Sequence, residues 1–406
     1  ADGVAALRQA VISARVPGML RAPAAPLVAL LGLVCAVSCT ELPTIEAAPV
    51  DGGGVDAGAL PDANALDGSS VDPGACRVPT VPAAECGAAC TKRSISTKLS
   101  AGAVDLVYPH GLAVAGRWLY FAVQENGVEG RNLNGRGAIF RVDRERLDSA
   151  DPAPMSGLLG RPRAITAGFG FVYWAAAAPT DATKTVIYRL ADNAEACGPM
   201  NCPPPEVIAT VSQPVTTLVV SSADRVLAMT DTLISIQKKP SGWLSAPVAV
   251  TTGGRKLAGL NGGVAFYASG LNVEAIRADG AVVSYATGVA KFNDLDVAAA
   301  CTEAAAFSTN SGVAFARSGS TLAPIQCTGQ CPGATTATVT YDGALDAGFL
   351  YLAAPDAGGL FRIPRGGGDG VNLMTGDFWD VAVDDDAVYG TDMTQKKIVR
   401  ILKRTP

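Results

Sequence analysis

Histidine chemistry is restricted to one position in this chain, because His110 is the only histidine among its 406 residues. Most histidine-based metal sites need two or more imidazoles, and a Ser-His-Asp triad would have to use His110. This residue stands in a tight Pro-His-Gly turn, and the sequence does not show the partners that a catalytic base requires. We therefore predict a structural or solvent-facing histidine, no catalytic residue and no metal site.

Three further patterns have the composition of functional motifs. Residues 365–370 (RGGGDG) lack the Lys-Ser/Thr pair of a phosphate loop, so we predict a hairpin turn. Calcium could bind at the aspartates 384–386 or among those scattered over 40–75, where EF-hand spacing is absent. No cofactor is predicted. Arginines that recur in the repeats described below could form an anion-binding ring, but we expect solvated strand residues.

The N-terminal region carries an export signal. Residues 19–39 read MLRAPAAPLVALLGLVCAVSC, with a basic residue, an apolar stretch and small residues before Cys39. The apolar stretch is short for a transmembrane helix, which needs about 20 residues. Residues 36–39 (AVSC) resemble a bacterial lipobox, with Ala36 where leucine is more common. The resemblance implies lipid attachment at Cys39 and cleavage before it. Residues 1–18 are interpreted as an over-extended start.

A tether is predicted between the lipid and the folded domain. Residues 40–75 are rich in Ala, Asp, Gly and Pro and contain no aromatic residue, a composition that favours disorder. Residues 76–92 are a cysteine-containing segment that leads into the domain at 93–406. We thus expect an exported protein, lipid-anchored to a bacterial membrane, at the outer membrane, the cell surface or in the periplasm.

The cysteines are predicted to form disulfides, because export favours oxidation over zinc binding. Cys35 belongs to the signal and Cys39 to the lipobox. The remaining eight are Cys76, Cys86, Cys90, Cys197, Cys202, Cys301, Cys327 and Cys331. Cys197–Cys202 and Cys327–Cys331 are plausible local bridges. We suggest that Cys301 holds Cys76, Cys86 or Cys90 and does not pair with Cys327 or Cys331.

Internal repeats define the domain. An apolar strand, a strand centred on a hydrophobic residue and a strand with an apolar-Arg-apolar step recur at intervals of 38 to 54 residues. The centres are Tyr120, Tyr173, Leu227, Phe266, Phe307, Tyr351 and Tyr389, and the later marks are Arg141, Arg189, Gln237, Arg277, Arg317, Arg362 and Arg400. This period predicts an all-β fold, a single β-propeller with seven blades of four antiparallel strands. The repeated aromatic residues are expected between blades in the core.

The last repeat lacks a fourth strand, and residues 94–99 (SISTKL) supply a matching one at the other end of the domain. We therefore predict that an N-terminal strand completes the last blade and removes two open edges. The stretches 109–114 with 119–122, and 381–384 with 388–392 and 398–401, resemble NHL-type propeller repeats. Members of that family bind proteins and some relatives are lyases, so the resemblance does not fix an activity.

The loops that lead into the first strands share one face with the loops between strands two and three. Function in propellers tends to reside in such loops, which a rigid scaffold holds. The binding residues predicted on this face are His110, Arg163, Asn293, Asp294, Trp379 and Asp380.

Our leading interpretation is a monomeric binding or scaffolding propeller whose partner is an envelope protein or a small ligand. A net charge of −5 argues against nucleic acid. An enzyme of the lactonase or lyase type is less favoured; its central-channel metal would need Asn293, Asp294 and Asp380 to converge. A structural envelope component is a third interpretation.

Overall fold

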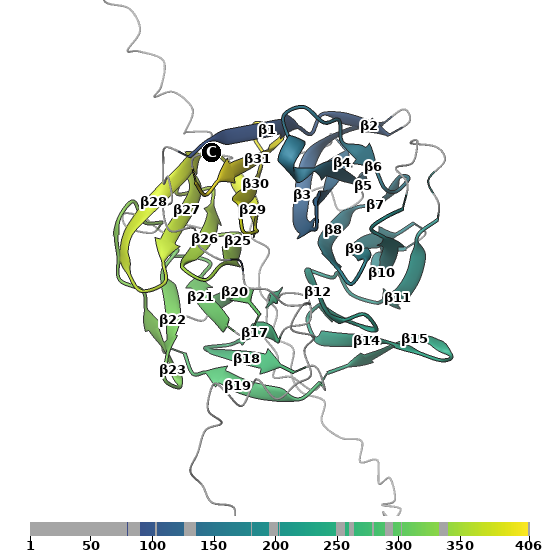
Figure 1. Cartoon of the computed structure of the whole chain (residues 1–406). Helices are drawn as coiled ribbons and strands as arrows, with labels where there is room; N and C mark the ends of the chain where they lie inside the picture. The colour runs from purple at the N-terminus through teal and green to yellow at the C-terminus, as the bar shows by residue number, and fades with distance from the viewer. Residues whose placement is uncertain are drawn as a thin grey trace, which may run out of the picture. The chain divides into compact units, whose positions relative to one another are not determined.

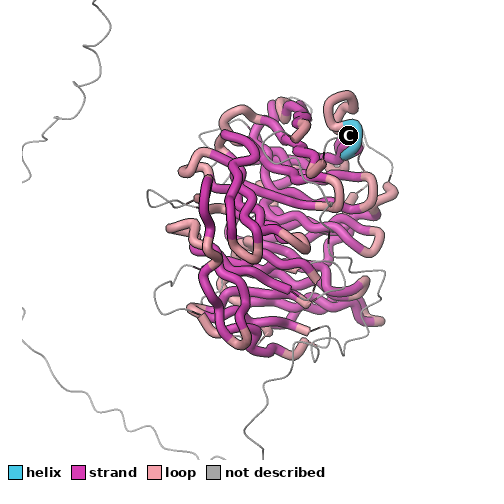
Figure 2. Tube along the Cα trace, turned by 60° about the vertical axis from the view of Figure 1, so that its left-hand side comes forward, coloured by secondary structure: helices cyan, strands magenta, loops and turns pink. Residues whose placement is uncertain are grey.

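The computed structural model describes residues 79, 90–101, 104–125, 135–179, 181–194, 202, 204–248, 256–259, 264–277, 280–288, 295–301, 303–332 and 340–404. The predicted signal peptide, Cys39 and the tether at 40–75 lie outside these residues. Within them, strands predominate and loops join them at both ends (Figure 2), with one short 3₁₀ helix at Arg144–Arg146. No helix in this described part is long and apolar enough to cross a membrane.

The strands form seven blades arranged in a ring (Figure 1), which confirms the predicted all-β propeller. Blade 1 contains β2 (Leu99–Ala101), β3 (Val104–Ala115), β4 (Trp118–Glu125), β5 (Arg136–Asp143), β6 (Ala153–Pro154) and β7 (Leu159–Gly160). Blade 2 contains β8 (Pro162–Gly168), β9 (Phe171–Ala178), β10 (Asp181–Ala191) and β11 (Glu206–Val211). Blade 3 contains β12 (Thr217–Ser222), β13 (Arg225–Met229), β14 (Leu233–Lys239) and β15 (Gly242–Pro247).

The remaining blades repeat this layout. Blade 4 contains β16 (Leu257–Ala258), β17 (Ala265–Ser269), β18 (Asn272–Ile276) and β19 (Val282–Ala286). Blade 5 contains β20 (Leu295–Ala300), β21 (Glu303–Ser308), β22 (Ala314–Ser318) and β23 (Thr321–Pro324). Blade 6 contains β25 (Asp342–Leu345), β26 (Phe349–Ala354), β27 (Gly359–Pro364), β28 (Gly368–Thr375) and, parallel to β28, β24 (Cys327–Gly329). Blade 7 contains β29 (Phe378–Val383), β30 (Ala387–Asp392), β31 (Lys397–Leu402) and β1 (Lys92–Ser96).

The ring is closed by β1, which lies beside β31 (Figure 1) and pairs with it in antiparallel register from Lys92 opposite Ile401 to Ser96 opposite Lys397. The predicted closing strand is therefore confirmed, although it begins two residues earlier than the repeat suggested. Immediately after it, the buried Thr97 donates its hydroxyl to the Val107 carbonyl at 2.9 Å, which ties blade 7 to blade 1. The N-terminal strand thus pairs with backbone N–H and C=O groups that would otherwise form an open edge of blade 7.

The seven repeat centres form the interior, as predicted. All of them, from Tyr120 to Tyr389, are fully buried. They pack across blade boundaries: Tyr389 of blade 7 lies in one cluster with Phe121 and Phe140 of blade 1, and Tyr351 of blade 6 packs with Val388 of blade 7. Each blade therefore supplies half of an apolar layer that its neighbour completes, and this shared burial holds the ring together.

The repeated arginines were expected in solvent, and for three of them this prediction is wrong. Arg141, Arg189 and Arg400 are each only 7% exposed. The Arg141 guanidinium lies 4.3 Å from the ring centroid of Trp118 and donates to the Asp192 carbonyl at 2.7 Å. Aromatic rings cover the long side chains of Arg141 and Arg189, and cation–π contact offsets part of their desolvation.

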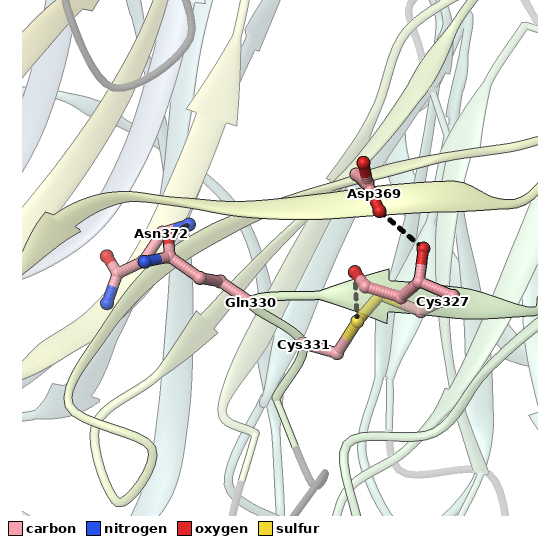
Figure 3. The surroundings of a disulfide bond; sticks show 6 residues. Cys327, Gln330, Cys331, Asp369 and Asn372 are labelled. Carbon is pink, nitrogen blue, oxygen red and sulfur yellow. Dashed lines mark hydrogen bonds between the residues drawn. A yellow bond between two sulfur atoms is a disulfide. The ribbon is translucent and has the colours of Figure 1, made fainter.

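The predicted Cys327–Cys331 disulfide is present at the end of β24, with Cα atoms 6.1 Å apart (Figure 3). This bridge excludes pairing of Cys301 with either residue. Cys90, Cys202 and Cys301 are also disulfide-bonded. The other candidates, Cys76, Cys86 and Cys197, lie outside the described residues, so the suggested partners of Cys301 stay a prediction.

Candidate binding site in the central channel

The innermost strands of the seven blades surround a cavity of about 390 Å³. These strands are β3, β8, β12, β16, β20, β25 and β29. Apart from the closing strand β1 of blade 7 and the short β2 of blade 1 and β24 of blade 6, each is the first strand of its blade, and it begins an antiparallel meander, so all seven run in the same direction along the channel. Their N-terminal ends therefore gather at one end, which we call the entrance end.

The two ends of the cavity differ in chemistry. Residues at the starts of the inner strands are polar or charged: Arg163, Thr216, Thr217, Lys256, Asp296, Tyr341, Asp342 and Asp380. Residues farther along the same strands are apolar: Val114, Ala167, Val219, Ala299, Leu345 and Val383. Desolvating charged groups without a compensating function is costly, so the entrance end is the candidate site.

Four of the six predicted binding residues come together at this end. Arg163 and Asp380 line the cavity, while His110 precedes the cavity-lining Gly111 and Trp379 precedes Asp380. The rings of His110 and Trp379 meet edge to face with centroids 6.0 Å apart. Asn293 and Asp294 lie outside the described residues. Sequence reasoning missed three charged members of the lining, Lys256, Asp296 and Asp342, although each also stands at the start of an inner strand.

β-Bulges interrupt the starts of the inner strands in blades 1, 2 and 7. The pairing register shifts between His110 and Leu112 in β3, between Pro162 and Ile165 in β8, and between Phe378 and Val381 in β29. Such bulges redirect side chains near functional sites. In β3 the bulge requires Gly111, which has φ +64° and whose missing Cβ would lie 2.8 Å from a methyl carbon of Ile165.

Asp380 is held in place by a buried hydroxyl. The Thr391 Oγ1 atom accepts a hydrogen bond from the Asp380 N–H at 3.0 Å and donates one to Asp380 Oδ2 at 2.9 Å. Thr391 is fully buried in β30, behind the bulge of β29. The second carboxylate oxygen, Oδ1, has no hydrogen-bond partner in the part of the chain that the structure describes. The carboxylate is therefore oriented by the scaffold and retains capacity for a donor in the channel.

Lys256 lies among three carboxylates. Its ammonium forms an ion pair with Asp342. Burial lowers the pKa of Lys256, and the nearby carboxylates of Asp296 and Asp380 act in the opposite direction. Asp342 also accepts the N–H of Val381 at 2.8 Å, so this cluster joins blades 4, 6 and 7.

Besides Lys256 of blade 4, two arginines at the start of blade 2 supply positive charge. Arg161 donates its Nε to Gln124 Oε1 at 3.0 Å, and Gln124 donates to the Pro162 carbonyl at 2.7 Å. Burial lowers the pKa of both Arg161 and Arg163, and the Arg163 charge further lowers that of Arg161. Among the described residues, the Arg163 guanidinium has neither an ion-pair nor a hydrogen-bond partner. It is thus the cation at the entrance end that is open to a ligand.

The surroundings of His110 favour its neutral form. Burial lowers the pKa of His110; the Asp380 carboxylate raises it, and the charges of Arg161 and Arg163 lower it. Its Nε2 is buried and has no hydrogen-bond partner within the described ranges. His110 precedes the cavity-lining Gly111 and interacts electrostatically with both Asp380 and Arg163.

An aromatic pair forms one wall of the entrance end. Tyr341 stacks face to face on Trp379, with centroids 4.5 Å apart and planes 6° from parallel. The Trp379 indole is fixed by a hydrogen bond from Nε1 to Asp377 Oδ1 at 2.8 Å. Tyr341 is 44% exposed, although most large aromatic residues in the described part of the chain are buried. Its outer face is available to a flat or apolar group.

Among the described residues, no group of three His, Cys, Asp or Glu side chains is placed to hold a metal ion. The metal set proposed from the sequence included Asn293 and Asp294, so the complete set is not described.

Comparison with known proteins adds the fold alone. No known family and no curated protein matches the sequence. Among solved structures, the periplasmic gluconolactonase PpgL of Pseudomonas aeruginosa is 13% identical, covering 77% of this chain and 99% of that one, with a TM-score of 0.47. The β-propeller domain of the Trilobed protease from Pyrococcus furiosus is 9% identical over 73% and 95% of the two chains, with a TM-score of 0.47. The PQQ-bound aldose sugar dehydrogenase of Streptomyces coelicolor is 15% identical over 80% and 99%, with a TM-score of 0.42.

Proposed function

We propose that this chain is an exported, lipid-anchored envelope protein whose propeller binds a small ligand at the entrance end of its channel. The observation that carries the binding function is a cavity of about 390 Å³ lined by both the Arg163 guanidinium, which has no described partner, and the oriented Asp380 carboxylate. Small-ligand pockets span roughly 300–1,000 Å³ and place a few polar groups on an otherwise apolar wall. The lipobox-like sequence at 36–39 and the tether at 40–75 support display on a membrane.

A small ligand is favoured over the structural interpretation by the contrast within the channel. A channel that binds no ligand can be lined with apolar side chains alone, as the far end is by Val219, Leu345 and Val383. The entrance end instead buries several charges in low dielectric, which usually lowers the free energy of unfolding. The enzyme interpretation depends on Asn293 and Asp294, and the geometry of the described residues adds no support to it.

The test uses the full-length protein purified from membranes in detergent. Fractions of small molecules from the host cell are screened for an increase in the thermal unfolding temperature, because a ligand that binds only the folded state stabilises it. We expect a fraction that stabilises the wild type and has at least about tenfold less affinity for Arg163→Gln. Arg93→Gln, which removes a half-exposed arginine on β1, is the matched control and should respond as the wild type does. A stabilising fraction that acts equally on Arg163→Gln, or no such fraction, would contradict the proposal.

A further inference from the structure

Apart from Lys256, which is paired with Asp342, the charges at the entrance end are arranged by sign. Arg161 and Arg163 come from blade 2, whereas Asp296, Asp342 and Asp380 come from blades 5, 6 and 7. Blade 1 lies between blades 7 and 2 and contributes the neutral His110 (Figure 1). In blade order, His110 of blade 1 therefore stands between Asp380 of blade 7 and Arg163 of blade 2.

Among the described residues, Arg163 has no ion-pair partner, and Asp380 forms no direct ion pair, although the Lys256 ammonium lies close enough to interact with it electrostatically. Lys256 forms its ion pair with Asp342, and Arg161 is held by Gln124. Asp380 receives a neutral hydroxyl, from Thr391, on one oxygen. A guanidinium binds carboxylates through paired hydrogen bonds, and a carboxylate binds ammonium groups in the same charge-assisted way. Lys256 itself shows that an ammonium is accommodated against the acidic part of this cavity.

We propose that the ligand is a small zwitterion, an amino acid whose carboxylate binds Arg163 and whose ammonium group binds Asp380. This inference rests on the proposed function and specifies its ligand class. Tyr341, stacked on Trp379, lines the same cavity as Asp380, and its exposed face suits a flat side chain. The favoured ligand is therefore an amino acid with an aromatic side chain.

Three probes of one shape separate the contributions of the two charges. L-Phenylalanine carries both groups, 3-phenylpropanoate lacks the ammonium, and 2-phenylethylammonium lacks the carboxylate. Binding of each to the full-length protein in detergent is measured by titration calorimetry at pH 7. We expect phenylalanine to bind at least about tenfold more tightly than either analogue, because each charged group adds a charge-assisted hydrogen bond.

Two conservative variants assign the contacts. Arg163→Gln should abolish the preference for phenylalanine over 2-phenylethylammonium, and Asp380→Asn should abolish the preference over 3-phenylpropanoate. Arg93→Gln should retain both preferences. Circular dichroism and the thermal unfolding temperature establish that each variant is folded before titration.

The outcomes distinguish this inference from the function on which it rests. Equal affinity for phenylalanine and 3-phenylpropanoate overturns the zwitterion in favour of an anion, and equal affinity for 2-phenylethylammonium overturns it in favour of a cation. If no probe binds while a cell fraction still stabilises the wild type through Arg163, the ligand class is wrong and the binding function stands. If no cell fraction stabilises the protein and no probe binds, both are wrong.

Discussion

The two ends of the central channel are built from the same seven strands and have opposite characters. At the entrance end, bulges and strand starts direct Arg163 and Asp380 toward the cavity. At the far end, regular pairing directs residues such as Leu345, only 1% exposed, into apolar clusters between blades. The contrast shows that one inner strand can serve two roles. Its regularly paired residues stabilise the ring, and its first, irregularly paired residues are available for binding.

The largest effect should follow from placing a charge at the far end. Leu345→Asp would bury a carboxylate among Leu350, Leu352 and Ile363, and we expect it to lower the free energy of unfolding by more than about 4 kcal/mol. Thr216→Asp, which adds the same group at an exposed position of the entrance end, should lower the free energy of unfolding by only about 1 kcal/mol. Urea unfolding measures both. Similar losses of unfolding free energy in the two variants would show that the two ends of the channel do not differ in their tolerance of charge.

Loss of Lys256 should be the next most damaging change, because it leaves Asp342 and its acidic neighbours without their cation. We expect Lys256→Met to lower the free energy of unfolding by about 3–5 kcal/mol, as removal of one partner of a buried ion pair does. The double variant Lys256→Met with Asp342→Asn should recover part of this loss. Equal stability of the single variant and the wild type in urea would show that the cluster is solvated.

The state of His110 should make stability depend on pH. Because burial lowers its pKa in the folded protein, the unfolded chain binds more protons below the ordinary histidine value, about 6.5. Its contribution is therefore fully present above that pH and is lost as the pH falls through it, by at most about 1.4 kcal/mol per pH unit. The difference in unfolding free energy between pH values of about 7.5 and 5.5 should be smaller in His110→Gln. An unchanged difference would mean that the imidazole is solvated.

The smallest effect on stability should come from Arg163→Gln. With no described partner to lose, the neutral amide should change the free energy of unfolding by less than about 1 kcal/mol, toward higher stability because the guanidinium is partly desolvated. The same variant should lose ligand binding. A large destabilisation in urea would instead make Arg163 a structural residue and weaken the contrast between the two ends.

The parts of this molecule that the sequence predicts well are those with strong periodicity. The spacing of Tyr120, Tyr173 and the later centres is sufficient for seven blades, because each aromatic residue must be buried against the next blade. His110, Arg163 and Asp380 were recognisable because their repeats are regular. Lys256 was not, because the inner strand of its blade spans only two residues, Leu257–Ala258, and such a short strand leaves little pattern in the sequence.

The burial of the repeated arginines was not predictable in the same way. Arg189 is covered by Phe171, which lies 18 residues earlier, and by Trp243 of the next blade. A period-two pattern indicates which face of a strand a residue occupies. It does not indicate whether neighbouring aromatic rings are large enough to cover a long side chain. Such coverage depends on tertiary packing and becomes visible only in the structure.

The pairing of β1 with β31 has a mechanical consequence. Tension on the N-terminal region would first meet Pro79, whose carbonyl accepts the Ala347 N–H of blade 6 at 3.0 Å, and then the closing strand that begins at Lys92. Five residue pairs join β1 to β31, so a pull that released the Pro79 contact would next load the seam that closes the ring. The disulfide of the buried Cys90, two residues before β1, lies where part of that load can be diverted from the seam.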